Sequence, residues 1–172
     1  MGDELVIEWK AFPLRPEPDP SVRFRGTYRE EGWRRCHAMA EPDGIHYTPY
    51  PRDDYPGWSL PALEAAKCVA LQGPEPFERL HLRLYEAFFT RSVNIAKPEE
   101  LLPEVRESGA DMSRFLADFE AGKGRAPVMA DYEGAITRDR VRAIPTIIVE
   151  GGARLTGLVD LATYRKAIEG GG

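Results

Sequence analysis

Hydrophobic and polar side chains alternate along the first segment of the chain. The segment from Glu4 to Phe12 reads ELVIEWKAF, which puts Leu5, Ile7 and Trp9 on one side of an extended chain. Alternation of this kind predicts a half-buried β-strand. The next eight residues, PLRPEPDP, contain four prolines and predict a stiff surface connection that ends the strand.

The middle of the chain changes to helical spacing, with apolar residues at every third or fourth position. This pattern predicts helices over residues 26–40, 59–71, 76–91, 97–109 and 112–122, with a loop rich in proline and tyrosine over 41–58. Ser59 and Asp111 are the predicted amino-terminal caps, and Pro103 predicts a kink or a short helix. The predicted apolar face of the first helix carries Tyr28, Trp33 and Met39. That of the third helix carries Phe77, Leu80, His81, Leu84, Tyr85 and Phe88.

The last third of the chain predicts a helix, a hairpin and a final helix. The helix covers residues 126–144, with Val128, Tyr132, Ala135 and Ile136 facing inward. A strand follows over residues 146–150, directly after Pro145, and a second strand returns over residues 153–158. Gly151 and Gly152 between them predict the hairpin turn, and Asp160 is the predicted cap of a helix over residues 161–169.

Composition narrows the classes of partner. Of the 172 residues, 42% are apolar and 30% are charged, which is typical of a globular protein rather than a disordered one. The net charge of −5 argues against a nucleic-acid partner, because phosphate binding favours a basic face. No apolar run approaches the ~18 residues of a membrane span, so we expect no membrane partner. The acidic start is not typical of a signal peptide, and we therefore predict a cytoplasmic protein.

Two cysteines are the first candidates for chemistry. Cys36 and Cys68 form no C-x-x-C motif and lack the spacing of metal ligands. Cys36 and His37 are neighbours on a predicted helix, where adjacent side chains diverge by ~100° and do not converge on one metal. Cys68 lies among small residues, where a buried thiol packs as a modest hydrophobe. We therefore predict structural roles for both cysteines and no metal site.

Histidine and carboxylate pairs are the other candidates. His81 lies on the apolar face of its helix, which predicts a core or domain-interface histidine, with an acid–base role as the alternative. The pairs Asp53-Asp54 and Glu99-Glu100 are adjacent in sequence and do not face one another on any regular element. They do not predict a catalytic dyad.

The segment RAIPTIIVEGGARLTGLVDLATYRKAIE resembles the second half of a thioredoxin-like fold. IEWKAFPLRP resembles the second strand of the DsbA-like branch, which includes FrnE-type proteins and 2-hydroxychromene-2-carboxylate isomerases, and the helices over residues 59–120 resemble the helical domain of that branch. The resemblance implies an α/β fold, a thioredoxin-like mixed sheet with an inserted all-helical domain. Residues 1–25 and 125–172 would form the discontinuous core, and residues 26–124 the helical insertion.

The resemblance also implies a binding site. In this superfamily the proline equivalent to Pro145 follows a cis peptide bond and stands beside the catalytic dithiol. Ile144, Pro145 and Thr146 are thus the expected substrate-binding residues, with a protein or a small thiol or disulfide as substrate. The branch places its C-x-x-C, or a serine in the isomerases, after a first strand that has no counterpart here, so we expect no catalytic residue in this chain.

In a thioredoxin-like sheet the first strand is central, so without it the neighbouring strands would lack hydrogen-bond partners. Each buried backbone group left without a partner would cost ~1–3 kcal/mol. Three arrangements would fill it: a longer natural protein, which we favour; a strand lent by another chain, as in a homodimer; or a rearranged sheet.

Three functions follow from these expectations. The first is a DsbA/FrnE-like thiol–disulfide oxidoreductase, inactive as written because no C-x-x-C is present. The second is a non-catalytic binding or assembly protein that uses an exposed sheet edge to pair with a partner or with itself. The third is a glutathione-dependent isomerase or transferase of the same branch. Glutathione would be the cofactor in the third case, and none is expected in the others.

Overall fold

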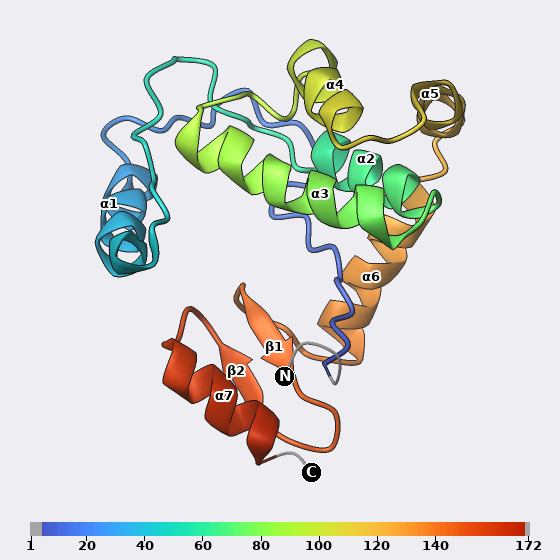
Figure 1. Ribbon diagram of the computed structural model, residues 1–172. Coiled ribbons are helices and arrows are strands. Elements are labelled where there is room, and N and C mark those ends of the chain that lie inside the picture. The colour runs from blue at the N-terminus through green and yellow to red at the C-terminus, as the bar shows by residue number, and fades with distance from the viewer. Residues whose placement is uncertain (1–4, 171–172) are drawn as a thin grey trace. The chain divides into compact units, whose positions relative to one another are not determined.

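The computed structural model describes residues 5–170, which divide into two compact units (Figure 1). The first unit extends to Ala130, and the second begins at Asp131. Helix α6 (Arg125–Thr137) crosses this boundary. None of the helices in the described range is long and apolar enough to cross a membrane.

The first unit is built from helices. Its elements are α1 (Tyr28–Ala40), a 3-10 helix η1 (Glu41–Asp43), α2 (Leu60–Ala70), α3 (Pro74–Tyr85), a π-helical turn η2 (Glu86–Thr90), α4 (Pro98–Glu107) and α5 (Met112–Glu120). The five predicted helices are therefore confirmed, with ends that differ by a few residues. The third continues from α3 into η2, where the backbone hydrogen bonds join residues five positions apart instead of four.

Local signals explain several helix ends. The Asp111 carboxylate accepts hydrogen bonds from the backbone N–H groups of Ser113 at 2.9 Å and Arg114 at 3.1 Å, which confirms the predicted cap of α5. Helix α4 begins at Pro98 and is 10 residues long with Pro103 inside it, so the prediction of a short helix is also confirmed.

Ser59 has a different role from the predicted one. Its side chain makes no capping bond to α2; its hydroxyl accepts a hydrogen bond from the backbone N–H of Arg15 at 3.0 Å. The Ser59 N–H donates in return to the Arg15 carbonyl at 3.0 Å, and the Asp19 N–H donates to the Gly57 carbonyl at 3.0 Å. A Cβ at Gly57 would lie 2.2 Å from the Asp19 carbonyl oxygen. The Ser59 hydroxyl therefore binds the proline-rich segment over residues 13–20 and does not cap α2.

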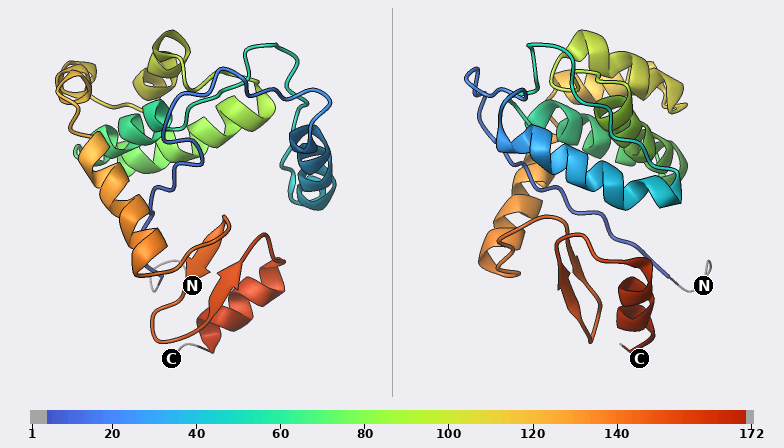
Figure 2. Two further views of the ribbon diagram at one scale, coloured as in Figure 1. Left: turned by 180° about the vertical axis from the view of Figure 1, so that it is seen from behind. Right: turned by 90° about the vertical axis from the view of Figure 1, so that its left-hand side faces the viewer.

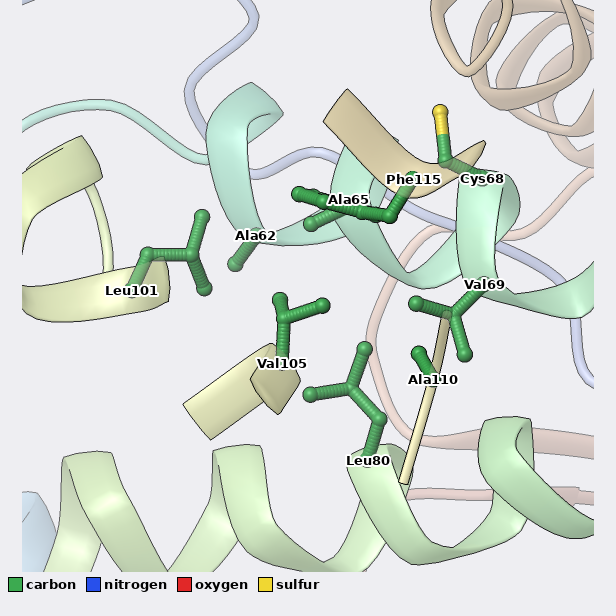
Figure 3. Packing of buried hydrophobic residues seen from close by; sticks show 9 residues of the cluster. All are labelled: Ala62, Ala65, Cys68, Val69, Leu80, Leu101, Val105, Ala110 and Phe115. Atoms are coloured by element: carbon green, nitrogen blue, oxygen red, sulfur yellow. The ribbon is translucent and has the colours of Figure 1, made fainter. Parts of the chain in front are cut away.

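The main hydrophobic core joins four helices. Figure 3 shows side chains from α2, α3, α4 and the start of α5 converging on one centre. Its buried members are Ala62, Ala65, Cys68, Val69, Leu80, Leu101, Val105, Ala110 and Phe115. The small residues on α2 let the other helices approach closely. Gly124 also approaches α2 closely, since a Cβ there would lie 2.3 Å from the Glu64 carbonyl oxygen.

A second, aromatic cluster holds α1. The ring of Trp33 lies 4.9 Å from Phe24 and 5.2 Å from Phe88, measured between ring centroids. Trp33 is the member of the predicted apolar face that is buried; Tyr28 is 75% exposed and Met39 is 57% exposed, so the prediction was wrong for these two. Trp33 is the buried residue of α1, so the helix packs on the rest of the unit around one large ring.

The segment over residues 5–13 contains no strand, so the strand predicted over residues 4–12 was wrong; residue 4 lies outside the described residues. A strand exists only with a neighbour that completes its hydrogen-bond ladder, and the described part of this unit has no strand to offer. Side chains hold the segment instead. Ala11 is buried with Leu60 and Val128, and the Trp9 ring lies 4.0 Å from the ring of His81.

The second unit begins inside α6, which ends at Thr137. The prediction carried this helix to residue 144 and was wrong by seven residues. Arg140 adopts a left-handed conformation with φ +49°, and the Val141 N–H donates to the Ala135 carbonyl at 2.8 Å. These interactions satisfy the last turn and direct the chain away from the helix axis.

The predicted inward face of α6 is largely confirmed. Val128 and Ala135 are buried and Tyr132 is half-buried. Ile136, in contrast, is 45% exposed. It was wrongly assigned because the helix ends one residue later, where neighbouring turns no longer cover the side chain.

A two-stranded antiparallel sheet follows, made of β1 (Thr146–Ile148) and β2 (Arg154–Thr156). Thr146 pairs with Thr156, and Ile148 pairs with Arg154. Both strands are shorter than predicted, and the predicted glycine turn between them is confirmed. Gly151 has a φ of +69°, which a residue with a side chain rarely adopts, and the Gly152 N–H closes the turn on the Val149 carbonyl at 3.0 Å.

Helix α7 (Leu161–Glu169) completes the second unit and runs beside the hairpin (Figure 2). The Asp160 side chain accepts a hydrogen bond from the Thr163 N–H at 2.7 Å, as predicted.

Candidate functional site

The three residues predicted to bind substrate form the entry to β1. The peptide bond between Ile144 and Pro145 is cis. The Pro145 carbonyl accepts a hydrogen bond from the Gly157 N–H at 2.8 Å, and the Thr146 hydroxyl donates to the Ala143 carbonyl at 2.6 Å. The loop is thereby tied to the return strand on one side and to itself on the other.

Ile144 presents its backbone without a partner. None of the hydrogen bonds among residues 5–170 uses its N–H or its carbonyl group, and the residue is 42% exposed. A backbone N–H and carbonyl that lie open beside a strand can pair with an extended chain, because such groups need a hydrogen-bond partner once water is excluded.

The hairpin and the segment after it also leave apolar side chains in solvent. The exposed fraction is 39% for Ile147, 50% for Ile148, 50% for Leu158 and 61% for Leu161. Neighbouring exposed apolar side chains on a short hairpin are typical of a surface that binds another chain. Strand β1 pairs with β2 along one edge, and no strand among residues 5–170 pairs with its other edge.

The two cysteines are poorly placed for nucleophilic chemistry. Cys68 is fully buried in the last turn of α2, and burial raises the pKa of its thiol. Cys36 lies half-buried in the second half of α1, and neither cysteine is in a disulfide. A thiolate is favoured at a helix amino terminus, and neither residue occupies one. Within residues 5–170, no group of histidine, cysteine and carboxylate side chains has an arrangement that could hold a metal ion.

His81 lies in an aromatic environment. Its ring centroid is 4.0 Å from Trp9, 5.0 Å from Tyr85 and 5.7 Å from Phe77. Burial lowers the pKa of His81, which favours the neutral ring. The three ring contacts support the packing role predicted for His81.

The sequence pattern missed a half-buried network of charges. Arg52 makes two hydrogen bonds of 2.6 Å to the carboxylate of Glu100, and it also binds Asp54. Lys97 binds Asp54 at 2.6 Å. Burial raises the pKa of Asp54, but the hydrogen bonds and charges of Lys97 and Arg52 outweigh it and lower the pKa to about 2. A carboxylate held ionised in this way is unsuited to proton transfer near neutral pH. Residues 52 and 54 lie more than 40 positions before residues 97 and 100, so no local signal could reveal the network.

A second network centres on Glu104 of α4, whose side chain is 5% exposed. Arg83 of α3 binds it at 3.0 Å, and Arg91 binds it at 2.6 Å. Burial raises the pKa of Glu104, but the hydrogen bonds and charges of Arg91 and Arg83 outweigh it and hold the pKa below its usual range. The cluster joins α3 to α4 and the segment after η2, and it has a structural role.

The helical unit, the hairpin and the loop before β1 together define a thioredoxin-like protein with inserted helices. The DSBA-like thioredoxin domain family matches residues 2–169, and the chain belongs to this family. The resemblance to the DsbA-like branch and the α/β fold class inferred from it are thereby confirmed.

One relative from Bacillus subtilis, "Uncharacterized protein YwbO", is 26% identical over 176 aligned residues. These cover 97% of this chain and 82% of YwbO.

Proposed function

We propose that this chain binds the substrate of a DsbA-like thiol–disulfide exchange reaction. Ile144, Pro145 and Thr146 form the substrate-facing surface, and an extended segment next to the substrate disulfide pairs with the backbone of Ile144. The support is the open N–H and carbonyl of Ile144 at the start of a strand, in a chain that belongs to the DSBA-like family. The substrate is a protein or a small disulfide.

The exchange itself needs a reactive thiolate. In this reaction a thiolate attacks one sulfur of the substrate disulfide, a mixed disulfide forms, and the other sulfur leaves as a thiolate. Cys68 is buried with a raised pKa, and Cys36 lacks a second cysteine at C-x-x-C spacing. We therefore propose that Cys36 and Cys68 do not catalyse exchange.

Peptide binding tests the proposed surface. The probe is an extended eight-residue peptide whose central cysteine is blocked as an S-methyl disulfide, and its affinity is measured by the shift of backbone amide resonances. We expect shifts at residues 143, 144 and 146. The Ile144 side chain, 42% exposed, flanks the pairing backbone groups, so Ile144→Ala should bind the peptide more weakly. Ile45→Ala is the matched control, since Ile45 is 53% exposed and lies outside the hairpin. Equal effects of the two substitutions would contradict the proposed surface.

An insulin-reduction assay tests the role of the two cysteines. With the full chain added, we expect turbidity to develop no faster than with dithiothreitol alone. A faster rate that Cys36→Ser abolishes would overturn the proposal that these thiols are inert.

A binding or assembly protein is the second candidate function. The unpaired edge of β1 and the exposed Ile147 and Ile148 favour it, because an open edge with apolar side chains pairs readily with another strand. Sedimentation velocity distinguishes a self-pairing protein from a monomer. A folded monomer at all concentrations would count against a homodimer that lends a strand.

Four further expectations are part of the proposal. The core would comprise residues 1–25 and 125–172, and the helical insertion residues 26–124. Glutathione would be the cofactor of the isomerase-like alternative, and titration with glutathione tests it. The protein would be cytoplasmic. Nucleic acids and membranes would not be its partners, which the net charge of −5 supports for nucleic acids.

A further inference from the structure

A pocket lies immediately before the loop described above. It has a volume of about 380 Å³ and is lined by Ile136, Thr137, Arg140, Val141 and Arg142. Its size is within the range of ~300–1,000 Å³ typical of ligand sites. Two apolar side chains and two guanidinium groups line the same small volume, so the pocket suits a ligand with an apolar part and a negative charge.

The two arginines have no side-chain partner in the described part of the chain. Among residues 5–170, neither Arg140 nor Arg142 forms an ion pair or a side-chain hydrogen bond, and both are exposed. Arg138, by contrast, binds Asp139 at 2.8 Å. Residues 136–142 contain three arginines and one aspartate in a chain of net charge −5, so positive charge is concentrated here.

Capping of α6 does not account for these arginines. Basic residues often neutralise the carbonyl groups at a helix carboxyl terminus. Here the Thr137 hydroxyl donates to the Glu133 carbonyl at 2.7 Å, and backbone N–H groups bind the carbonyls of Gly134 and Ala135. These carbonyls are already satisfied, and the guanidinium groups remain free for a ligand.

We propose that this pocket binds a carboxylate, with Arg140 and Arg142 as its ligands and Ile136 and Val141 as the apolar wall. Arginine recognises carboxylates through its planar fork of donors. Arg142 is two residues before Ile144, which corresponds to at most ~7 Å of chain. The inference deepens the proposed function, on which it rests for the substrate: an extended substrate at Ile144 would carry an acidic residue within a few positions of its disulfide.

Binding measurements on the full chain test this site without any exchange chemistry. The probes are the peptides acetyl-Leu-Glu-Leu-amide and acetyl-Leu-Gln-Leu-amide, together with isovalerate and its neutral amide. We expect each acid to shift the amide resonances of residues 136–142 and to bind at least fivefold more tightly than its neutral analogue at low salt. The preference should fall as salt rises, because exposed charges are screened.

Arg142→Gln should weaken the binding of the acids at least fivefold. The matched control is Arg165→Gln on α7, an exposed arginine that does not line the pocket. Equal binding of acid and amide, or no difference between the two variants, would overturn the site. If the acidic peptide binds more tightly than isovalerate, the ligand of the site is an acidic segment of a protein. If isovalerate binds more tightly, the ligand is a small carboxylic acid.

The same peptides separate this site from the proposed surface at Ile144. If Ile144→Ala weakens binding of the neutral peptide, and the acidic peptide binds no more tightly than the neutral one, the carboxylate site fails and the proposed function stands. If the acid depends on Arg142 but not on Ile144, the carboxylate site stands and the proposed surface fails.

Discussion

Glu104 offers a sharp test of how the helical unit is held together. The substitution Glu104→Gln keeps the size of the side chain and removes its charge. The wild-type carboxylate, 5% exposed, accepts hydrogen bonds from Arg83 at 3.0 Å and Arg91 at 2.6 Å. Both arginines bind the same carboxylate oxygen, Oε2, so the glutamine carbonyl can replace the acceptor but not the buried negative charge. The other carboxylates beside these arginines, Glu107 and Glu86, are 63% and 59% exposed.

The expected loss follows from these contacts. Breaking a buried ion pair costs ~3–5 kcal/mol when both partners are out of water. The side chains of Arg83 and Arg91 are 27% and 39% exposed, so part of their charge is solvated and the cost is lower. We expect Glu104→Gln to lower the free energy of unfolding by about 2 kcal/mol. With a slope of ~2 kcal/mol per molar urea, the midpoint moves by ~1 M.

Urea unfolding followed by circular dichroism at pH 7 measures this loss. Glu107→Gln is the matched control: Glu107 also binds Arg83, but its side chain is 63% exposed, so we expect a change below ~0.5 kcal/mol. Equal losses for the two variants would refute the assignment of stability to the buried pair.

The pH dependence supplies a second check on Glu104. Its pKa in the folded protein is lowered, so the stabilisation is present above the unfolded pKa of ~4.3 and is lost as the pH falls through the folded value. The difference between wild type and Glu104→Gln should therefore shrink below about pH 4. A difference that stays constant down to pH 3 would contradict the pairing.

Three other predictions test the core, the close contacts and the charge network. Leu80→Ala should cost about 3 kcal/mol, because Leu80 is 0% exposed, whereas Leu82→Ala on the same helix, at 70% exposure, should cost less than ~0.5 kcal/mol by urea unfolding. Gly124→Ala should destabilise by about 2 kcal/mol, because its Cβ would lie 2.3 Å from a carbonyl oxygen of α2, whereas Gly32→Ala, with open space around it, should stabilise α1 by ~0.5–1 kcal/mol. The Asp54 carboxyl should titrate at about 2 by carbon NMR, and a value near 4 would contradict the network around it.

Local patterns were enough for the helices and the hairpin. The spacing of Leu80 and its neighbours, the caps Asp111 and Asp160, and the glycine turn at Gly151 act within a few residues of themselves. Such signals are readable in one sequence because the interactions that they report are local. The candidate site was located from the resemblance around Pro145, since composition and spacing alone allow proline at the start of any strand.

The wrong predictions concern features that depend on residues distant in the sequence. The segment over residues 5–12 alternates like a strand, but alternation cannot supply the neighbour that a strand requires. Ser59 has the sequence signature of a cap, yet its hydroxyl is bound by Arg15, 44 residues away. Arg140, whose left-handed conformation follows the end of α6, is not a residue type that favours this conformation, so nothing in the sequence marks it.

Ala11 and Val128 belong to one small cluster with Leu60, although 117 positions separate them in the chain. The first and last segments of the helical unit are therefore neighbours. A unit whose two ends lie close together can be inserted into a surface loop of another protein without separating the parts of that protein. A short flexible linker could accordingly join these two segments of the helical unit.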